Sequence, residues 1–185
     1  MKRFYKYAIL FMTVVLLAAC SASEEEALTE TETAVQEVLK ADTLARNKEK
    51  DAFEYYMPIE FSIVEQDDYN IVFSKGKTNI ILFVNPNENA KSDNLYKEAA
   101  EDRNVILDKT WEEGEQLAYL IVDSLKEEKY ELVVGVGGVK LTAETTASDM
   151  VADAKLMMQV AESVVIKDQP SEQNNPTESK TESNA

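Results

Sequence analysis

Between Pro58 and Thr145, apolar and polar residues alternate in short runs, and this pattern constrains the fold more than any other feature of the chain. A period of two residues places one side of a strand against a core and the other side in solvent. The runs are separated by short segments that contain Gly, Asn and Asp, which are typical turn residues. The pattern therefore predicts an antiparallel sheet.

The first half of this region predicts three strands and a helix. The strands are expected over 59–63, 71–74 and 78–84, with a turn at Asp67–Asn70 between the first two. The run 78–84 is apolar on both faces, which predicts a central strand. Ser92 is expected to cap a short helix that ends near Asp102.

The second half predicts four more strands, over 105–111, 116–122, 130–136 and 139–145. The segment 116–122 also fits a helical period when Leu125 is included, so a helix remains an alternative there. The β-branched pair Ile121-Val122 favours the strand.

The motif Gly135-Val136-Gly137-Gly138 raises the question of a phosphate-binding loop. Such a loop opens a helix, whose N-terminus helps to bind the anion. Here the strand period resumes at Val139, and the spacing is not that of a dinucleotide fingerprint. A two-residue Gly-Gly turn supplies the positive φ that a tight hairpin requires, so the motif predicts a hairpin.

Helices are predicted at both ends of this region. A partial apolar stripe predicts one over 32–47, and Thr146–Asp149 fits a capping box that opens a last helix. The last helix carries the clearest apolar stripe of the chain, and core packing is the interpretation we favour over a methionine-rich groove for a partner. Its stripe consists of Val151, Ala154, Met158, Ala161 and Val165.

The predicted fold class is α+β, an antiparallel meander sheet of about six to seven strands with N-terminal, middle and C-terminal helices packed on it. Over about 53–166, this order of elements resembles Mog1/PsbP-type domains. The resemblance implies a small accessory domain and assigns no functional residue.

The N-terminal sequence predicts where in the cell the protein is located. Basic residues among the first six positions precede an apolar run over 8–17, which is too short to span a bilayer and suits a signal peptide. The run ends in Leu17-Ala18-Ala19-Cys20, which resembles the lipobox of bacterial lipoproteins. The resemblance implies cleavage after residue 19 and a diacylglycerol, with acyl chains such as palmitate, on the thiol of Cys20. It also implies a protein held on the extracytoplasmic face of the cell membrane, as in small uncharacterised lipoproteins of Gram-positive, Bacillus-type bacteria.

The mature chain is expected to have three parts. These are an acidic, solvated tether over 20–33, a single α+β domain over 34–167 and a disordered polar tail over 168–185. The formal net charge is −16, and loss of residues 1–19 removes three positive charges, which takes it to −19. Such a chain is repelled by anionic membranes and by nucleic acid, so nucleic acid is not expected as a partner.

Several kinds of chemistry are excluded or weakened by the residue types. The chain has no histidine and a single cysteine, which removes catalytic triads, His-based zinc sites and thiol catalysis. Ser74 and Lys75 point to opposite faces of one strand and are a poor Ser–Lys dyad. Glu65–Asn70 is rich in oxygen ligands but lacks the register of an EF-hand loop, so a plain turn is favoured over a calcium site.

The remaining catalytic possibility is a pair of carboxylates. Glu112, Glu113 and Glu115 beside Trp111 are the best candidates for a carboxylate-dependent hydrolase, although a solvated turn explains them more simply. We expect no enzyme, cofactor or metal. The favoured function is a non-enzymatic accessory or interaction domain with an envelope protein as partner. The alternative is a module that binds a small ligand or ion on the sheet face or at the Asn85–Asn89 loop.

Overall fold

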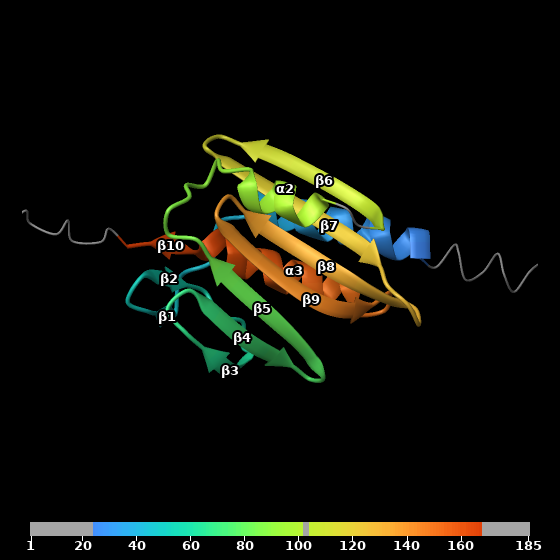
Figure 1. The fold of residues 1–185 in the computed structure, drawn as a ribbon, viewed down its shortest axis with the longest axis horizontal. Helices are drawn as coiled ribbons and strands as arrows, with labels where there is room; N and C mark the ends of the chain where they lie inside the picture. Colours follow the sequence, from blue (N-terminus) through green and yellow to red (C-terminus); the bar gives the residue numbers. More distant parts are fainter. Residues whose placement is uncertain (1–23, 102–103, 168–185) are drawn as a thin grey trace, which may run out of the picture.

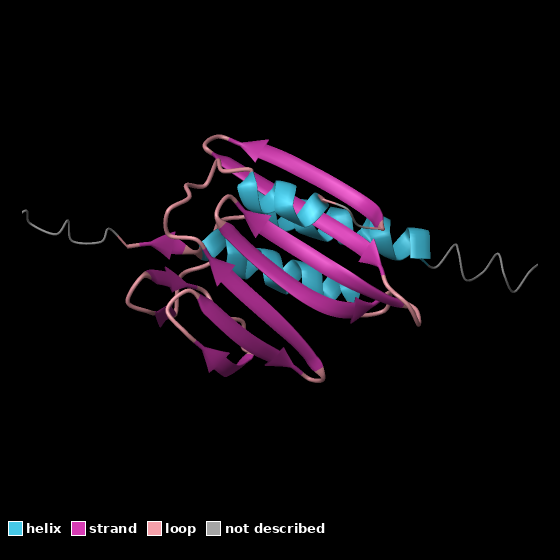
Figure 2. Cartoon of the chain, in the orientation of Figure 1, coloured by secondary structure: helices cyan, strands magenta, loops and turns pink. Residues whose placement is uncertain are grey.

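The computed structural model describes residues 24–101 and 104–167, which are built around a seven-stranded antiparallel sheet (Figures 1 and 2). The strands are β3 (Ser62–Gln66), β4 (Asn70–Lys75), β5 (Thr78–Val84), β6 (Val105–Glu113), β7 (Gln116–Ser124), β8 (Lys129–Val136) and β9 (Val139–Thr146). The predicted α+β class is confirmed. The strand interpretation of 116–122 is also confirmed, because β7 pairs with β6 on one side and β8 on the other.

The strands lie in the order β3-β4-β5-β9-β8-β7-β6, so two meanders share one sheet. After β5 the chain crosses one face of the sheet through α2 (Asn94–Ala100) and enters again at the far edge as β6 (Figure 1). β5 therefore pairs with β9 and not with β6. This crossover places the loop that follows β5 against the β8–β9 hairpin.

Helices cover the two faces of the sheet unequally. On the inner face, α3 (Met150–Ser163) and a helix over 24–40 contribute to one large apolar cluster with alternate residues of the strands. On the outer face, α2 covers a second, small cluster over β7 and β8 that includes Tyr119, Ile121 and Val133 (Figure 1). The outer face of β3, β4 and β5 has no helix over it (Figure 2).

A second sheet of three short strands closes the inner layer. It consists of β1 (Lys48–Glu49), β2 (Phe53–Tyr55) and β10 (Val165–Ile166), in the order β1-β2-β10. The rings of Tyr55 and Phe73 lie 6.1 Å apart between centroids, which attaches β2 to β4. Strands of two or three residues are too short to show a period, so the sequence did not predict this sheet.

The N-terminal prediction needs a correction. Residues 24–33, which we predicted as part of a solvated tether, are helical, and the helix extends through 24–40 and not through 32–47. Thr31 is fully buried, and the hydroxyl of Tyr130 donates to the Glu24 carboxylate over 2.6 Å. Lys109 pairs with Glu32 over 3.1 Å. Glu24 and Glu32 of the acidic run therefore have partners on the sheet, and the small side chains of Ala27 and Thr31 are buried.

The predicted boundaries of other elements also shift. The strand expected over 59–63 begins at Ser62, because Phe61 packs on Phe73 at 5.3 Å between ring centroids and Ile59 stands 95% exposed in the preceding turn. The short helix runs over Asn94–Ala100 with Asp93 as its N-cap, so Ser92 is not the cap.

The predicted capping box of the last helix is also wrong. The N-cap of α3 is Asp149, without a side-chain cap, and the Thr146 hydroxyl donates to the Asp149 carboxylate over 2.9 Å. Thr146 is still paired in β9, so it is not placed to cap a helix amide.

Three predictions concern residues outside the described ranges. They are the signal peptide over 1–19, the lipid on Cys20 and the disordered tail over 168–185. Within the described ranges, no helix has both the length and the apolar character needed to cross a membrane.

Candidate functional site

The carboxylates proposed for hydrolysis lie at the β6–β7 turn. Glu112, Glu113 and Glu115 are all exposed, and the side chain of Glu115 is 91% exposed while it pairs with Lys91 over 2.7 Å. A pair of glycosidase carboxylates needs a cleft in which one of them is desolvated. The exposure of these three glutamates supports a solvated turn and not a catalytic pair.

The segment Glu65–Asn70 contains the end of β3, the β3–β4 turn and the first residue of β4. The Asp67 carboxylate accepts the amides of Tyr69 and Asn70 over 2.9 and 2.7 Å, and these bonds with the Asn70 side chain hold the pKa of Asp67 below its ordinary value. Its oxygens therefore stabilise the turn. In residues 24–101 and 104–167, no group of three or more acidic, histidine or cysteine side chains has the arrangement of a metal site.

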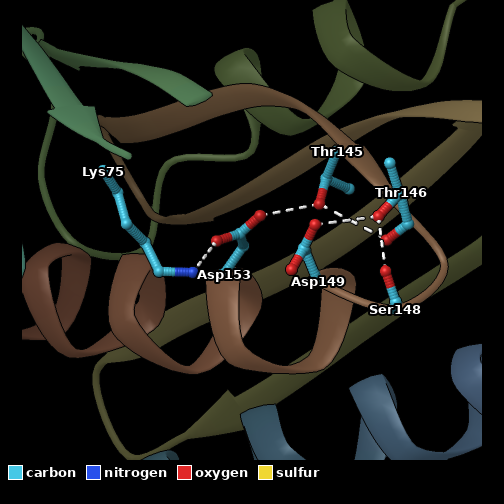
Figure 3. Close-up of polar contacts among 6 residues, drawn as sticks. All are labelled: Lys75, Thr145, Thr146, Ser148, Asp149 and Asp153. Atoms are coloured by element: carbon cyan, nitrogen blue, oxygen red, sulfur yellow. Dashed lines mark hydrogen bonds and ion pairs between the residues drawn. The ribbon is translucent and has the colours of Figure 1, made fainter. Parts of the chain in front are cut away.

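A buried polar cluster joins three elements that the sequence analysis did not connect (Figure 3). Lys75 on β4 donates to Asp153 Oδ1 on α3 over 2.6 Å, and Thr145 on β9 donates to Asp153 Oδ2 over 2.6 Å. The side chain of Asp153 is 0% exposed and that of Lys75 is 24% exposed.

The contacts of this cluster suit a structural role. Both carboxylate oxygens of Asp153 already accept a strong hydrogen bond, which ties the first turn of α3 to two strands. The sequence did contain a signal, because the charged Asp153 lies at helical spacing between the apolar Met150 and Met157, and all three are buried. Lys75 faces inward while its neighbour Ser74 does not contribute to the core cluster, which agrees with rejecting a Ser–Lys dyad.

The glycine motif forms the β8–β9 hairpin, as predicted, and Val136 pairs with Val139 across it. Gly137 has a φ of 54°, and a Cβ on it would lie 2.4 Å from the Asn89 carbonyl oxygen and 2.5 Å from Ala90 Cα. The hairpin is therefore the support on which the loop after β5 rests.

Backbone hydrogen bonds fasten that loop to the sheet. Asn85 N–H donates to Gly138 O over 2.8 Å, and Leu117 N–H donates to Ala90 O over 2.8 Å. Within the loop, the Glu88 carboxylate accepts the Asn85 amide over 2.7 Å and the Ser92 hydroxyl over 2.6 Å. The loop is thus held in one conformation by backbone bonds to the sheet at both of its ends and by the Glu88 contacts within it.

A pocket of about 520 Å³ opens between this loop and the end of α3. Its lining combines apolar residues, among them Val136, Val139 and Ala161, with the polar residues Asn87 and Asn89. The complete lining is Pro86, Asn87, Glu88, Asn89, Ala90, Gln116, Val136, Gly138, Val139, Ala161, Glu162, Val164, Val165 and Ile166. The loop that the sequence suggested for a ligand therefore borders a cavity.

Glu162 brings an acidic group to this pocket. Burial raises the pKa of its carboxyl above the ordinary value of 4.5, a hydrogen bond from Thr43 over 3.3 Å opposes the rise, and the charge of Glu113 adds to it. The pocket lining contains two acidic residues, Glu88 and Glu162, and no basic residue. It favours a neutral or cationic ligand.

We expect Glu162→Gln to stabilise the protein at neutral pH, because a raised pKa means that the folded state disfavours the ionised carboxyl. The wild-type stability is fully present below pH 4.5 and falls as pH rises through the raised pKa of Glu162. The difference between variant and wild type should therefore grow from pH 4 to pH 7. Urea unfolding across this range measures it, with the exposed Glu112→Gln as control. A stability difference between variant and wild type that shrinks as pH rises would contradict a raised pKa of Glu162.

The open outer face of the sheet is the second candidate site. Val72 on β4 pairs with Ile81 on β5, and Val64 lies at the bulge where β3 shifts register beside them. Ile81 is 48% exposed and Val64 is 63% exposed. We call Val64, Val72 and Ile81 the open strip. The run 78–84 is apolar on both faces, as noted above, but only its inner face is buried.

Comparisons with known proteins show a similarity to solved structures. No family model and no curated protein matches the chain. Among solved structures, it is similar to the solution structure of cyanobacterial PsbP (CyanoP) from Synechocystis sp. PCC 6803. The identity is 14% and the TM-score 0.42, and the match covers 70% of this chain and 95% of CyanoP. PsbP, to which the order of elements was compared, is thus among the matched structures. The resemblance to Bacillus-type lipoproteins stays a prediction.

Proposed function

We propose that this protein is a lipid-anchored extracytoplasmic domain that acts by binding another envelope protein and not by catalysis. The observation that carries the proposal is the open strip of Val64, Val72 and Ile81. Val64 and Ile81 are exposed and Val72 is half-buried. Exposed apolar side chains grouped on one face of a sheet are typical of a surface that a partner covers. The α2 helix covers the same face over β7 and β8, and Phe83 near the end of β5 packs against the small cluster beneath it, while the open strip lies outside this cluster.

The proposed anchor sets the distance between the domain and the membrane. Glu24 is bonded to Tyr130 on β8, so three residues separate Cys20 from the first described residue of the folded domain. Four peptide units span at most about 14 Å. A lipid on Cys20 therefore keeps the domain next to the bilayer, where a membrane-embedded or peripheral partner is within reach.

Cys20→Ala is expected to release the protein from the membrane or to leave it as an unprocessed precursor, because the thiol is the proposed site of the lipid. Two acyl chains hold a protein stably where one chain is marginal. Fractionation of cells and labelling with a radioactive fatty acid measure both effects. Unchanged membrane retention of the variant would refute the anchor.

The partner is tested by photo-crosslinking in living cells. A photo-reactive amino acid is placed at position 81 in the open strip, and at position 112 on β6 as an exposed control. We expect one dominant adduct from position 81 in the anchored form, reduced in the Cys20→Ala form. Equal adducts from both positions, or none from position 81, would contradict the interaction role of this face.

The pocket supports a second candidate function, the binding of a small neutral or cationic ligand. Its position between the loop after β5 and the end of α3, with Glu88 and Glu162 in its lining, is the specific observation in favour. Calorimetry with small amines and divalent cations tests it, with Glu162→Gln expected to weaken the binding of a cation. Absence of heat with every candidate would count against this function.

A further inference from the structure

The seven-stranded sheet is open at β3. This strand ends the sheet on one side, and all five of its residues, Ser62–Gln66, are exposed. An edge strand carries a row of backbone N–H and C=O groups that pair with no neighbour on one side. Ile63 is 40% exposed and Val64 is 63% exposed, so this edge also presents apolar side chains.

The chain that forms this edge is acidic, and the basic group beside it is Lys50, whose ammonium donates to the Asp67 carbonyl oxygen in the β3–β4 turn. From residue 51 to residue 74 the chain contains acidic residues and no lysine or arginine. Glu60 and Glu65, which flank the exposed apolar residues, are themselves exposed. A segment that lies along β3 would therefore meet apolar side chains next to carboxylates.

We propose that the β3 edge takes up an extended segment of a partner protein as an additional antiparallel strand, and that this segment alternates apolar residues with lysine or arginine. Backbone hydrogen bonds supply affinity in this mode of binding, and the side chains supply specificity. Opposite charges that face each other across a strand pair increase the affinity further. The inference rests on the proposed interaction function and specifies the chemistry of the partner.

A second copy of this chain fits the edge less well. Two β3 strands paired around a two-fold axis would bring Glu60 and Glu65 of one copy near those of the other. Like charges across a strand pair are destabilising, and each copy carries a formal net charge of −16.

The test uses two synthetic eight-residue peptides as probes, one of alternating valine and lysine and one of alternating valine and glutamate. They are added to the full chain carrying Cys20→Ala. Fluorescence anisotropy measures affinity, and amide hydrogen exchange locates the binding. We expect the lysine peptide to bind and to slow exchange in β3, and the glutamate peptide to do neither.

Two double variants separate the edge from general charge attraction. Glu60→Lys with Glu65→Lys should weaken the lysine peptide about tenfold and let the glutamate peptide bind. Glu112→Lys with Glu113→Lys changes the net charge equally at the opposite edge, β6, and should leave the lysine peptide within about twofold. Equal losses in both variants, or protection outside β3, would overturn the proposal.

The two proposals can fail separately. A crosslinked partner at position 81 without peptide binding at β3 would leave the interaction function standing and remove the strand-addition mode. Peptide binding at β3 without any crosslinked partner in cells would remove the interaction function as stated.

Discussion

Replacing Lys75 with methionine is expected to lower the free energy of unfolding by about 3 kcal/mol, because the change leaves a buried carboxylate without its cation. Asp153 is fully buried and accepts from Lys75 over 2.6 Å (Figure 3). Methionine keeps most of the apolar part of the side chain and removes the ammonium group together with its hydrogen bond to Asp153. The partial exposure of Lys75 holds the effect at the lower end of the range for broken buried pairs. Urea unfolding of the Cys20→Ala form provides the measurement.

Two further variants test whether the loss of stability comes from the unpaired carboxylate of Asp153. Lys77→Met removes an exposed lysine from the β4–β5 turn and should change the free energy of unfolding by less than about 0.5 kcal/mol. Lys75→Met combined with Asp153→Leu should recover much of the loss, because an apolar pair no longer buries an unpaired charge. If Lys75→Met costs no more than Lys77→Met, the pair does not hold α3 to the sheet.

Gly137→Ala is expected to cost about 3 kcal/mol and to detach the loop after β5 from the β8–β9 hairpin. The new Cβ would lie 2.4 Å from the Asn89 carbonyl oxygen and 2.5 Å from Ala90 Cα, both of which are backbone atoms that cannot rotate away. The positive φ of Gly137 adds about 1 kcal/mol. Amide exchange at Asn85 and Leu117 should accelerate, because their hydrogen bonds join the loop to the sheet.

Gly76→Ala is the matched control for this effect. Gly76 has a φ of 61° in the β4–β5 turn, and nothing lies within 4 Å of a Cβ built on it. The substitution should therefore cost only the conformational part, about 1 kcal/mol, and leave loop exchange unchanged. Equal costs at Gly76 and Gly137 would show that the loop does not depend on the hairpin.

The sequence predicted the local structure of the sheet well, because each strand carries its own period and most turns carry their own residues. Gly76, Gly114 and Gly137 each occupy the first central position of a two-residue hairpin turn with positive φ. The β7–β8 turn had no such signal. There Glu127 and Glu128 take positive φ angles of 61° and 57°, a conformation that the pairing of two strong strands imposes.

The candidate sites were less predictable, because their residues meet only through long-range packing. Lys75, Thr145 and Asp153 lie on three elements, and no local pattern places a lysine of β4 against a helix that begins after β9. The pocket depends in the same way on the crossover that brings the Asn85–Asn89 loop against α3. The acidic run over 24–33 resembled a tether, since charge was its only local signal.

By itself, the sequence indicated the α+β class, most of the strands, the three hairpins with a glycine turn and the candidate lipid site at Cys20, since all of these depend on neighbours in the chain. Only the tertiary structure decided that β5 pairs with β9, that the acidic N-terminal segment docks as a helix, and that β3 and the open strip stay uncovered. The physical reason is that burial is shared among distant segments. An apolar run such as 78–84 shows which residues are suited to burial. Whether each of them is buried depends on the segments that pack against it in the folded protein.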